Sequence, residues 1–108
     1  MLRMLTLCIA LALPLAAAAG AMEPVESGRG FDLYRIAFVG GEPARVGVSP
    51  AVGSEIDVYV FDAEEQLVCR SGGAKEQSCE WLPGKTSEYW ILVRNRGDED
   101  AAYMIWTN

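Results

Sequence analysis

The sequence predicts an all-β fold, an antiparallel β-sandwich of about seven short strands with one disulfide bond. Three observations predict it. Apolar and polar residues alternate over short runs, turn-forming residues (Gly, Pro, Asp and Ser) separate these runs, and no segment shows a long helical period. Runs that turn roughly every 8 to 12 residues are typical of two antiparallel sheets packed face to face.

The first 21 residues are predicted to be a secretory signal peptide. Arg3 gives a positive start, residues 5–19 are a short Ala-rich apolar run, and residues 19–21 read Ala-Gly-Ala, a small-residue cleavage site. A retained membrane anchor is one alternative, which the lack of a basic stop after the run disfavours. A lipoprotein is another, which the position of Cys8 inside the run disfavours. We therefore expect an exported protein, periplasmic or extracellular, with no membrane span after cleavage.

The mature chain is then residues 22–108, with a flexible leader at 22–30 and a single β-sandwich domain at 31–108. A domain of this size is marginally stable, so a covalent staple is expected in an oxidising compartment. Cys69 and Cys79 are the two cysteines that remain after cleavage, and they are predicted to form a disulfide. Closing this loop stabilises the fold by roughly 2.5–3 kcal/mol on a chain-entropy estimate.

The mature chain is acidic. Without Arg3 it keeps eight basic side chains against fifteen acidic ones, a net charge of −7. A surface of that charge repels nucleic acid and anionic lipid, so no nucleic-acid partner is expected. Solubility is the simplest explanation of the charge.

The strands follow from the alternating runs taken in order. They are predicted at residues 31–39, 44–49, 56–61, 66–70, 78–82, 88–95 and 101–107. Gly40-Gly41 is predicted to be a hairpin turn, because glycine tolerates positive φ. The other breaks are the loop 50–55, the Asp-led turn 62–65, the glycine-containing loop 71–77, the Pro-Gly turn 83–87 and the turn 96–100. The alternation predicts one shared face on four strands: Ala44, Val46 and Val48; Ile56, Val58 and Val60; Tyr89, Ile91 and Val93; Tyr103, Ile105 and Thr107.

Four segments together resemble the bacterial pre-peptidase C-terminal domain. They are GGEPARVGVSP, SEIDVYVFDAEEQLVC, CEWLPGKTSEYWILVRNRG and AYMIWTN. In that family a D-x-D-L-Y-V-x-D strand is followed by W-x-P-x-x-T-G-x-Y-x-I-x-V-x-N and a closing Y-x-L strand. The resemblance implies a jelly-roll-like β-sandwich without catalysis of its own, usually appended to secreted proteases and other exported enzymes. Some relatives bind calcium or a polymeric substrate.

The family pattern maps onto this chain with some departures. Its acidic positions fall on Glu55, Asp57 and Asp62, its tryptophan and proline on Trp81 and Pro83, and its asparagine on Asn95. The first acid is Glu instead of Asp, and Thr86-Ser87 replaces the usual Thr-Gly. We expect a free-standing relative, because no enzyme domain precedes the module in this sequence.

The residue types needed for most catalytic mechanisms are missing. The sequence has no histidine, and both mature cysteines are predicted to be oxidised. No nucleophile elbow, P-loop or dinucleotide motif is present. A carboxylate pair is the one remaining route, and a chain without cleft-building helices or long loops offers little to raise the pKa of one member. We expect no enzymatic activity and no cofactor, and calcium is the one ion that stays open.

Calcium is the one metal that the sequence suggests. Glu55 and Asp57 share a strand face, and carboxylates are ligands that calcium accepts. Asp62 lies about 16 Å further along an extended strand, so one ion cannot bind both aspartates. The alternative is structural: Asp62 starts a turn and Asp57 bonds to a neighbouring backbone group.

Four apolar residues alternate with the predicted core positions of the last two strands. They are Trp90, Leu92, Met104 and Trp106. If the two strands form a hairpin, Trp90 lies opposite Trp106 and Leu92 opposite Met104, an aromatic cluster on the face away from the core. Such a patch is typical of an interface for a protein or envelope partner, and tryptophan is also a platform for polysaccharide rings. The alternatives are that the leader or a loop covers the cluster, or that the inward face is reversed.

The sequence thus predicts a non-catalytic exported module that acts by binding through this aromatic surface. A carbohydrate- or polymer-binding module, or a calcium-stabilised accessory domain of a secreted enzyme system, is the alternative function.

Overall fold

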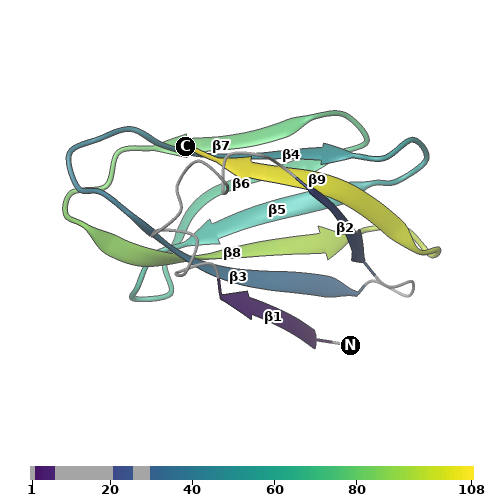
Figure 1. Ribbon diagram of the computed structural model, residues 1–108, viewed down its shortest axis with the longest axis horizontal. Helices are drawn as coiled ribbons and strands as arrows, with labels where there is room; N and C mark the ends of the chain where they lie inside the picture. Colours follow the sequence, from purple (N-terminus) through teal and green to yellow (C-terminus); the bar gives the residue numbers. More distant parts are fainter. Residues whose placement is uncertain (1, 7–20, 26–29) are drawn as a thin grey trace.

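The computed structural model describes residues 2–6, 21–25 and 30–108, which form two β-sheets packed face to face (Figure 1). The strands are β1 Leu2–Thr6, β2 Ala21–Val25, β3 Phe31–Phe38, β4 Ala44–Pro50, β5 Ile56–Phe61, β6 Leu67–Gly73, β7 Gln77–Trp81, β8 Ser87–Asn95 and β9 Ala101–Thr107. Sheet A has the order β1-β3-β8-β5-β6, and sheet B has the order β2-β9-β4-β7. No helix among the described residues is long and apolar enough to span a membrane.

The predicted fold class is confirmed. Residues 31–107 form seven strands, and every pairing among these seven is antiparallel. The predicted strand ends agree with the structure to within one residue, except that β6 runs on to Gly73. The Ser-Gly-Gly sequence at its end is typical of a loop, but here it pairs with β5 opposite Ile56 to Val58.

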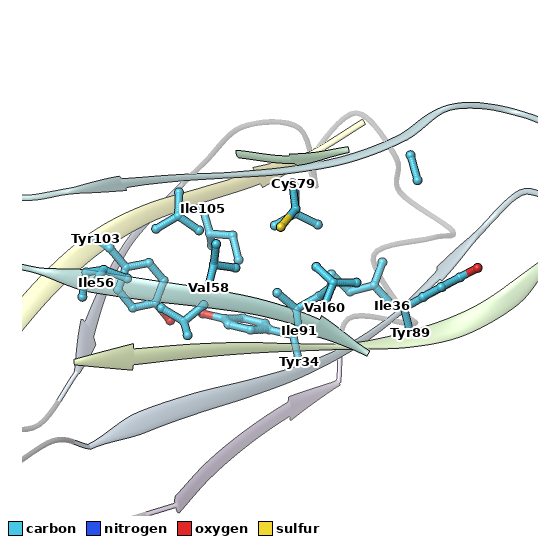
Figure 2. Packing of buried hydrophobic residues seen from close by; sticks show 14 of the residues in the cluster. Tyr34, Ile36, Ile56, Val58, Val60, Cys79, Tyr89, Ile91, Tyr103 and Ile105 are labelled. Carbon is cyan, nitrogen blue, oxygen red and sulfur yellow. The ribbon is translucent and has the colours of Figure 1, made fainter. Parts of the chain in front are cut away.

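The core lies between the two sheets and consists of the side chains that alternation assigns to it (Figure 2). The buried apolar residues are Tyr34, Ile36, Phe38, Ala44, Val46, Val48, Ile56, Val58, Val60, Cys79, Tyr89, Ile91, Val93, Ala101, Tyr103 and Ile105. These include all the inward-facing residues predicted from the sequence except Thr107, which is half-buried at the end of β9. Their removal from water is the main favourable contribution to the stability of this small domain.

Two expected hairpins are wrong. The Gly40-Gly41 turn connects β3 of sheet A to β4 of sheet B, and residues 96–100 connect β8 of sheet A to β9 of sheet B. Gly41 has a φ of +81°, so the expectation that glycine is needed here for a positive φ is correct. Gly40 also lies so close to the backbone of Lys85 that no Cβ fits. A short turn can lead into a crossover as well as into a hairpin, so its length alone does not decide between them.

The side chain of Asn95 holds the second crossover in place. This buried asparagine accepts a hydrogen bond from Gly97 N at 2.8 Å and donates one to the carbonyl oxygen of Glu99 at 2.7 Å. The amide of Arg96 donates to the carbonyl oxygen of Glu55 at 3.0 Å, which ties the crossover to the chain entering β5. These contacts direct the chain away from β8 and into the opposite sheet.

The predicted disulfide between Cys69 and Cys79 is confirmed. Cys69 lies on β6 at one edge of sheet A, and Cys79 lies on β7 at one edge of sheet B. The Cα atoms are 5.8 Å apart. The bond therefore joins the two sheets along one side of the sandwich.

Two further strands come from the segments assigned to the signal peptide and the leader. β1 pairs with β3 in parallel, and β2 pairs with β9 antiparallel, so the expected leader is a strand over residues 22–25. Pro24 lies in β2 at the edge of sheet B, where a residue without an N–H group is tolerated. Most of the signal peptide falls on residues 7–20, outside the described residues, and its cleavage stays a prediction. β1 and β2 are both edge strands, so the seven strands from β3 to β9 occupy the rest of each sheet.

Candidate functional site

The four predicted binding residues lie on opposite outer sides of the sandwich. Trp90 and Leu92 point outward from β8 in sheet A, whereas Met104 and Trp106 point outward from β9 in sheet B. The prediction that all four point away from the core agrees with this arrangement, but the single cluster of two facing tryptophans is wrong. Side-chain alternation determines which residues face outward, whereas the sheet order determines which outer surface they share.

The outer side of sheet A carries a larger set, which we call the aromatic face. Its residues are Leu33, Arg35, Tyr59, Phe61, Arg70, Trp90 and Leu92. They form two adjacent cross-strand rows. One row runs from Leu33 through Leu92 and Tyr59 to Arg70, and the other runs from Arg35 through Trp90 to Phe61. Side chains paired in this way are in contact range across neighbouring strands.

The charged side chains of this face lie against its aromatic rings. The guanidinium carbon of Arg35 is 5.6 Å from the Trp90 ring centroid, and that of Arg70 is 5.3 Å from the Tyr59 centroid. Both distances fit cation–π contacts. Tyr59 and Phe61 are stacked, with centroids 6.3 Å apart and planes 12° apart. The rings and arginines therefore support each other, with the three rings and Arg35 half-buried and Arg70 exposed.

An open depression lies on the same face. It has a volume of about 370 Å³, and its lining includes Leu33, Phe61, Trp90 and Glu65. Glu65 comes from the β5–β6 turn and has a φ of +66°. That turn is held by Asp62, whose carboxylate accepts hydrogen bonds from Glu64 N at 2.9 Å and Gln66 N at 2.8 Å. Among the described residues, three apolar side chains and one carboxylate line the depression.

Trp106 has a packing role on the other side of the sandwich. Its indole ring lies over Gly47 of β4, where an added Cβ would overlap the ring. The ring shields the backbone of a strand that has no side chain at this position. Met104 is exposed nearby but has no second aromatic partner on β4, since Ser49 lies opposite it.

Asp57 points outward from sheet A but is buried. Its carboxylate is 3.5 Å from Nε of Arg96 and lies over Gly72, which leaves room for it by lacking a side chain. Glu55 is exposed, and its backbone carbonyl accepts from Arg96. No group of three or more metal-ligating side chains occurs within the described ranges. The calcium hypothesis for Glu55 and Asp57 stays a prediction.

A buried polar network inside the sandwich was missed by the sequence analysis. Tyr103 donates a hydrogen bond to Asp32 at 2.6 Å, and the hydroxyls of Tyr34 and Tyr103 are 2.6 Å apart. Both tyrosine side chains lie between the two sheets (Figure 2). Burial, and then the neighbouring Tyr34 and Asp32, raise the pKa of the Tyr103 hydroxyl above its ordinary value. Tyr103 therefore stays protonated and remains a donor to the buried Asp32. Asp32 alternates in step with the core residues of β3, and a carboxylate at an inward position could have indicated a buried polar network.

The residues that carried the family resemblance have architectural contacts. Trp81 packs edge-on against Phe38 at a centroid distance of 4.9 Å and lies tilted against Tyr89 at 5.2 Å. The carbonyl oxygen of Pro83 accepts a hydrogen bond from Gly41 N at 2.8 Å. Together with Asn95, these residues lie at the ends of the sandwich. Of the family's motif positions, the tyrosine at Tyr59 belongs to the aromatic face.

Comparisons with known proteins support the fold. No family model matches the chain, and no curated protein matches its sequence. Among solved structures, the pre-peptidase C-terminal domain of a collagenase from Bacillus anthracis superposes with a TM-score of 0.67 at 10% identity, covering 100% of this chain and 95% of that one. CorA, a surface-associated copper-binding protein of Methylomicrobium album BG8, has a TM-score of 0.58 at 8% identity, covering 82% and 92%.

A third similar structure is PliG of Aeromonas hydrophila, a periplasmic inhibitor of g-type lysozyme. Its TM-score is 0.56 at 16% identity, and the match covers 99% of this chain and 96% of that one. At these identities the likeness shows the fold alone. The resemblance to the pre-peptidase C-terminal domain is therefore confirmed as a fold, and the solved structures place this chain among β-sandwich-like domains that include a copper-binding protein and an enzyme inhibitor.

Proposed function

We propose that this chain is an exported, non-catalytic binding module of the pre-peptidase C-terminal type, and that it binds a protein or envelope partner through the aromatic face of sheet A. The observation that carries the proposal is the set of three aromatic rings, two leucines and two arginines on one outer sheet surface. Aromatic residues and arginine are enriched where proteins bind each other.

The rest of the chain supports binding over catalysis. The sequence has no histidine, and Cys69 is bonded to Cys79, so neither thiol serves as a nucleophile. The buried network of Asp32, Tyr34 and Tyr103 is enclosed by the two sheets and offers no access to a substrate. Similar folds are found in a periplasmic lysozyme inhibitor and in a surface-associated copper-binding protein, which supports an exported binding module.

Partner capture with matched variants tests this function. The purified protein, immobilised, is incubated with envelope and medium extracts of the source organism, beside the Trp90→Ser/Phe61→Ser double variant and the Met104→Ser control. Met104 is exposed on the opposite sheet, so its loss removes an apolar side chain without touching the aromatic face. We expect a partner that is retained by the wild type and the control but lost from the double variant. Equal retention by all three would refute the proposal.

Export is tested separately by locating the protein in cell fractions and determining its first residue. A chain with a C-terminal tag should accumulate in the periplasm or medium and begin near Met22 by mass spectrometry. An intact N-terminus retained in the membrane fraction would instead support the membrane-anchor alternative.

A carbohydrate- or polymer-binding module is the second candidate. The observation that favours it is the presence of Tyr59, Phe61 and Trp90 on one sheet surface, since aromatic rings are platforms for sugars. Tryptophan fluorescence against a panel of polysaccharides tests it. A response that disappears in Trp90→Ser would favour this candidate, and no response across the panel would exclude the panel's sugars as ligands.

A further inference from the structure

The distribution of charge identifies the kind of partner that the aromatic face fits. Residues 30–108 carry seven basic and thirteen acidic side chains. Four of the seven bases lie on or beside the aromatic face: Arg35, Arg70, Arg94 and Arg96. Four of the thirteen acids do, namely Glu55, Asp57, Glu65 and Glu88. The remainder of the domain therefore has three bases and nine acids, so the aromatic face and its border are nearly neutral on an acidic protein.

Several of these arginines are free to bind a carboxylate. Within residues 30–108, neither Arg70 nor Arg94 forms an ion pair, and both are exposed. Arg35 pairs with Glu88 at 3.6 Å, but both side chains are more than 40% exposed, so this pair is weak and exchangeable. Only Arg96 is committed, because it balances the buried Asp57.

The arginines on the rings are also pre-positioned. Arg35 rests against Trp90 and Arg70 against Tyr59, which restricts the guanidinium groups before any partner arrives. A restricted guanidinium loses less conformational entropy when it forms a bidentate hydrogen-bonded pair with a carboxylate. The same contacts cover part of the Trp90 and Tyr59 ring faces on which a sugar would stack. This arrangement favours a peptide segment over a polysaccharide.

The apolar depression and the arginines have a fixed spacing. The depression lies at Trp90, and Arg94 lies four residues further along the same strand, on the same outer side. Four residues of extended chain span about 13 Å. Glu65 borders the depression at the opposite end from Arg94, so it repels a carboxylate there and admits an apolar side chain.

We propose that the aromatic face binds an acidic peptide segment of a partner protein, with an apolar side chain in the depression and carboxylates on Arg70 and Arg94. This inference rests on the proposed binding function and adds the chemistry of the partner. It predicts a bound segment in which the apolar residue and an acidic residue are about four positions apart in extended conformation.

The test is selection from a random 12-residue peptide display library on the purified protein, followed by affinity measurements on the selected peptides. Peptides that also bind Trp90→Ser are removed. The Arg70→Gln/Arg94→Gln double variant is compared with a Lys75→Gln/Lys85→Gln control, which loses the same charge from exposed positions outside the strands. Unchanged melting temperatures establish that both variants fold.

The expected peptides carry Asp or Glu together with an aromatic or aliphatic residue. Their dissociation constants should rise at least tenfold in the Arg70/Arg94 double variant and at high salt, and stay unchanged in the lysine control. The inference is overturned if the selected peptides are neutral or basic, if none depends on Trp90, or if both double variants bind equally. It is also overturned if a uronic-acid polymer binds in a Trp90-dependent manner while no peptide does.

This outcome is distinguishable from failure of the proposed function. A native partner that needs Trp90 but binds the Arg70→Gln/Arg94→Gln variant normally would keep the binding function and remove only the acidic-peptide chemistry. No Trp90-dependent partner in extracts and no selected peptide would remove both.

Discussion

The indole ring of Trp106 lies over Gly47 on the neighbouring strand, and a Cβ at Gly47 would overlap that ring. The pair explains why a tryptophan that points away from the core is half-buried and why a glycine is present in the middle of β4. The glycine weakens the strand by itself, and the ring compensates by covering its backbone.

Gly47→Ala is therefore expected to destabilise the protein by about 1–3 kcal/mol, because the new methyl group forces the indole out of its position. Urea unfolding measures the change. Gly84→Ala is the matched control, since no atom lies near a Cβ at Gly84 and its φ is not positive; its cost should be within about 0.5 kcal/mol. The Gly47→Ala/Trp106→Ala variant should show coupling between the two sites. Equal stability of the two alanine variants would contradict this packing.

The strands and their inward faces could be predicted because both follow from local alternation. Ile56, Val58 and Val60 face inward wherever β5 lies in the molecule, and the same holds for Tyr89, Ile91 and Val93 of β8. The pairing of strands could not be predicted, because a five-residue connection such as 96–100 suits a hairpin and a crossover equally. The deciding contacts, from Asn95 to Gly97 and Glu99, involve polar side chains that no periodicity describes.

The candidate site was predicted only in part for the same reason. Trp90 and Leu92 were found because they alternate with core residues. Their actual neighbours, Leu33, Arg35 and Phe61, come from strands far away in sequence, which the sheet order brings together. Leu33 and Phe61 alternate with the core residues of β3 and β5, and apolar residues at such outward positions could have indicated the aromatic face.

The disulfide should contribute a large part of the stability, because it closes a loop and joins two edge strands. Replacing both Cys69 and Cys79 with Ala is expected to lower the free energy of unfolding by about 2–4 kcal/mol. Urea unfolding of the variant, and of the wild type with and without a reducing agent, measures it. The two measurements should agree. A loss below about 1 kcal/mol would mean that the interface between the sheets holds without the bond.

Removing Arg96 from the Asp57–Arg96 pair should lower the stability of the protein more than removing Asp57. Arg96→Gln leaves a buried carboxylate without its cation and should cost about 1–3 kcal/mol. Asp57→Asn leaves an arginine that reaches solvent and should cost less. Thermal unfolding of both variants tests this order, and a greater loss in Asp57→Asn would contradict it.

Calcium is tested with the same variants. Because Arg96 already balances the charge of Asp57, we expect the same melting temperature in EDTA and in millimolar calcium. A ligand that binds only the folded state raises stability by RT ln(1 + [L]/Kd). An increase in calcium that disappears in Asp57→Asn would therefore overturn our expectation and establish the calcium-stabilised module.

Tyr103 should make the protein sensitive to alkaline pH. The unfolded chain releases a tyrosine proton near pH 10, whereas burial keeps the pKa of folded Tyr103 above that value. The folded state thus retains a proton that the unfolded state has lost. The contribution of Tyr103 is complete below about pH 10 and falls above it, with a limiting slope of about 1.4 kcal/mol per pH unit.

Urea unfolding between neutral pH and pH 11 tests this dependence. Tyr103→Phe should lower the free energy of unfolding by about 1–3 kcal/mol at neutral pH, because the buried Asp32 loses a donor. Above pH 10 its free energy of unfolding should fall less steeply with pH than that of the wild type, by the slope that corresponds to about one proton. Tyr59→Phe, on the outer face of sheet A, is the matched control and should keep that slope. If Tyr103→Phe lost stability above pH 10 as steeply as the wild type does, the alkaline sensitivity would have another source. The network would then be a packing feature without a role in the pH response.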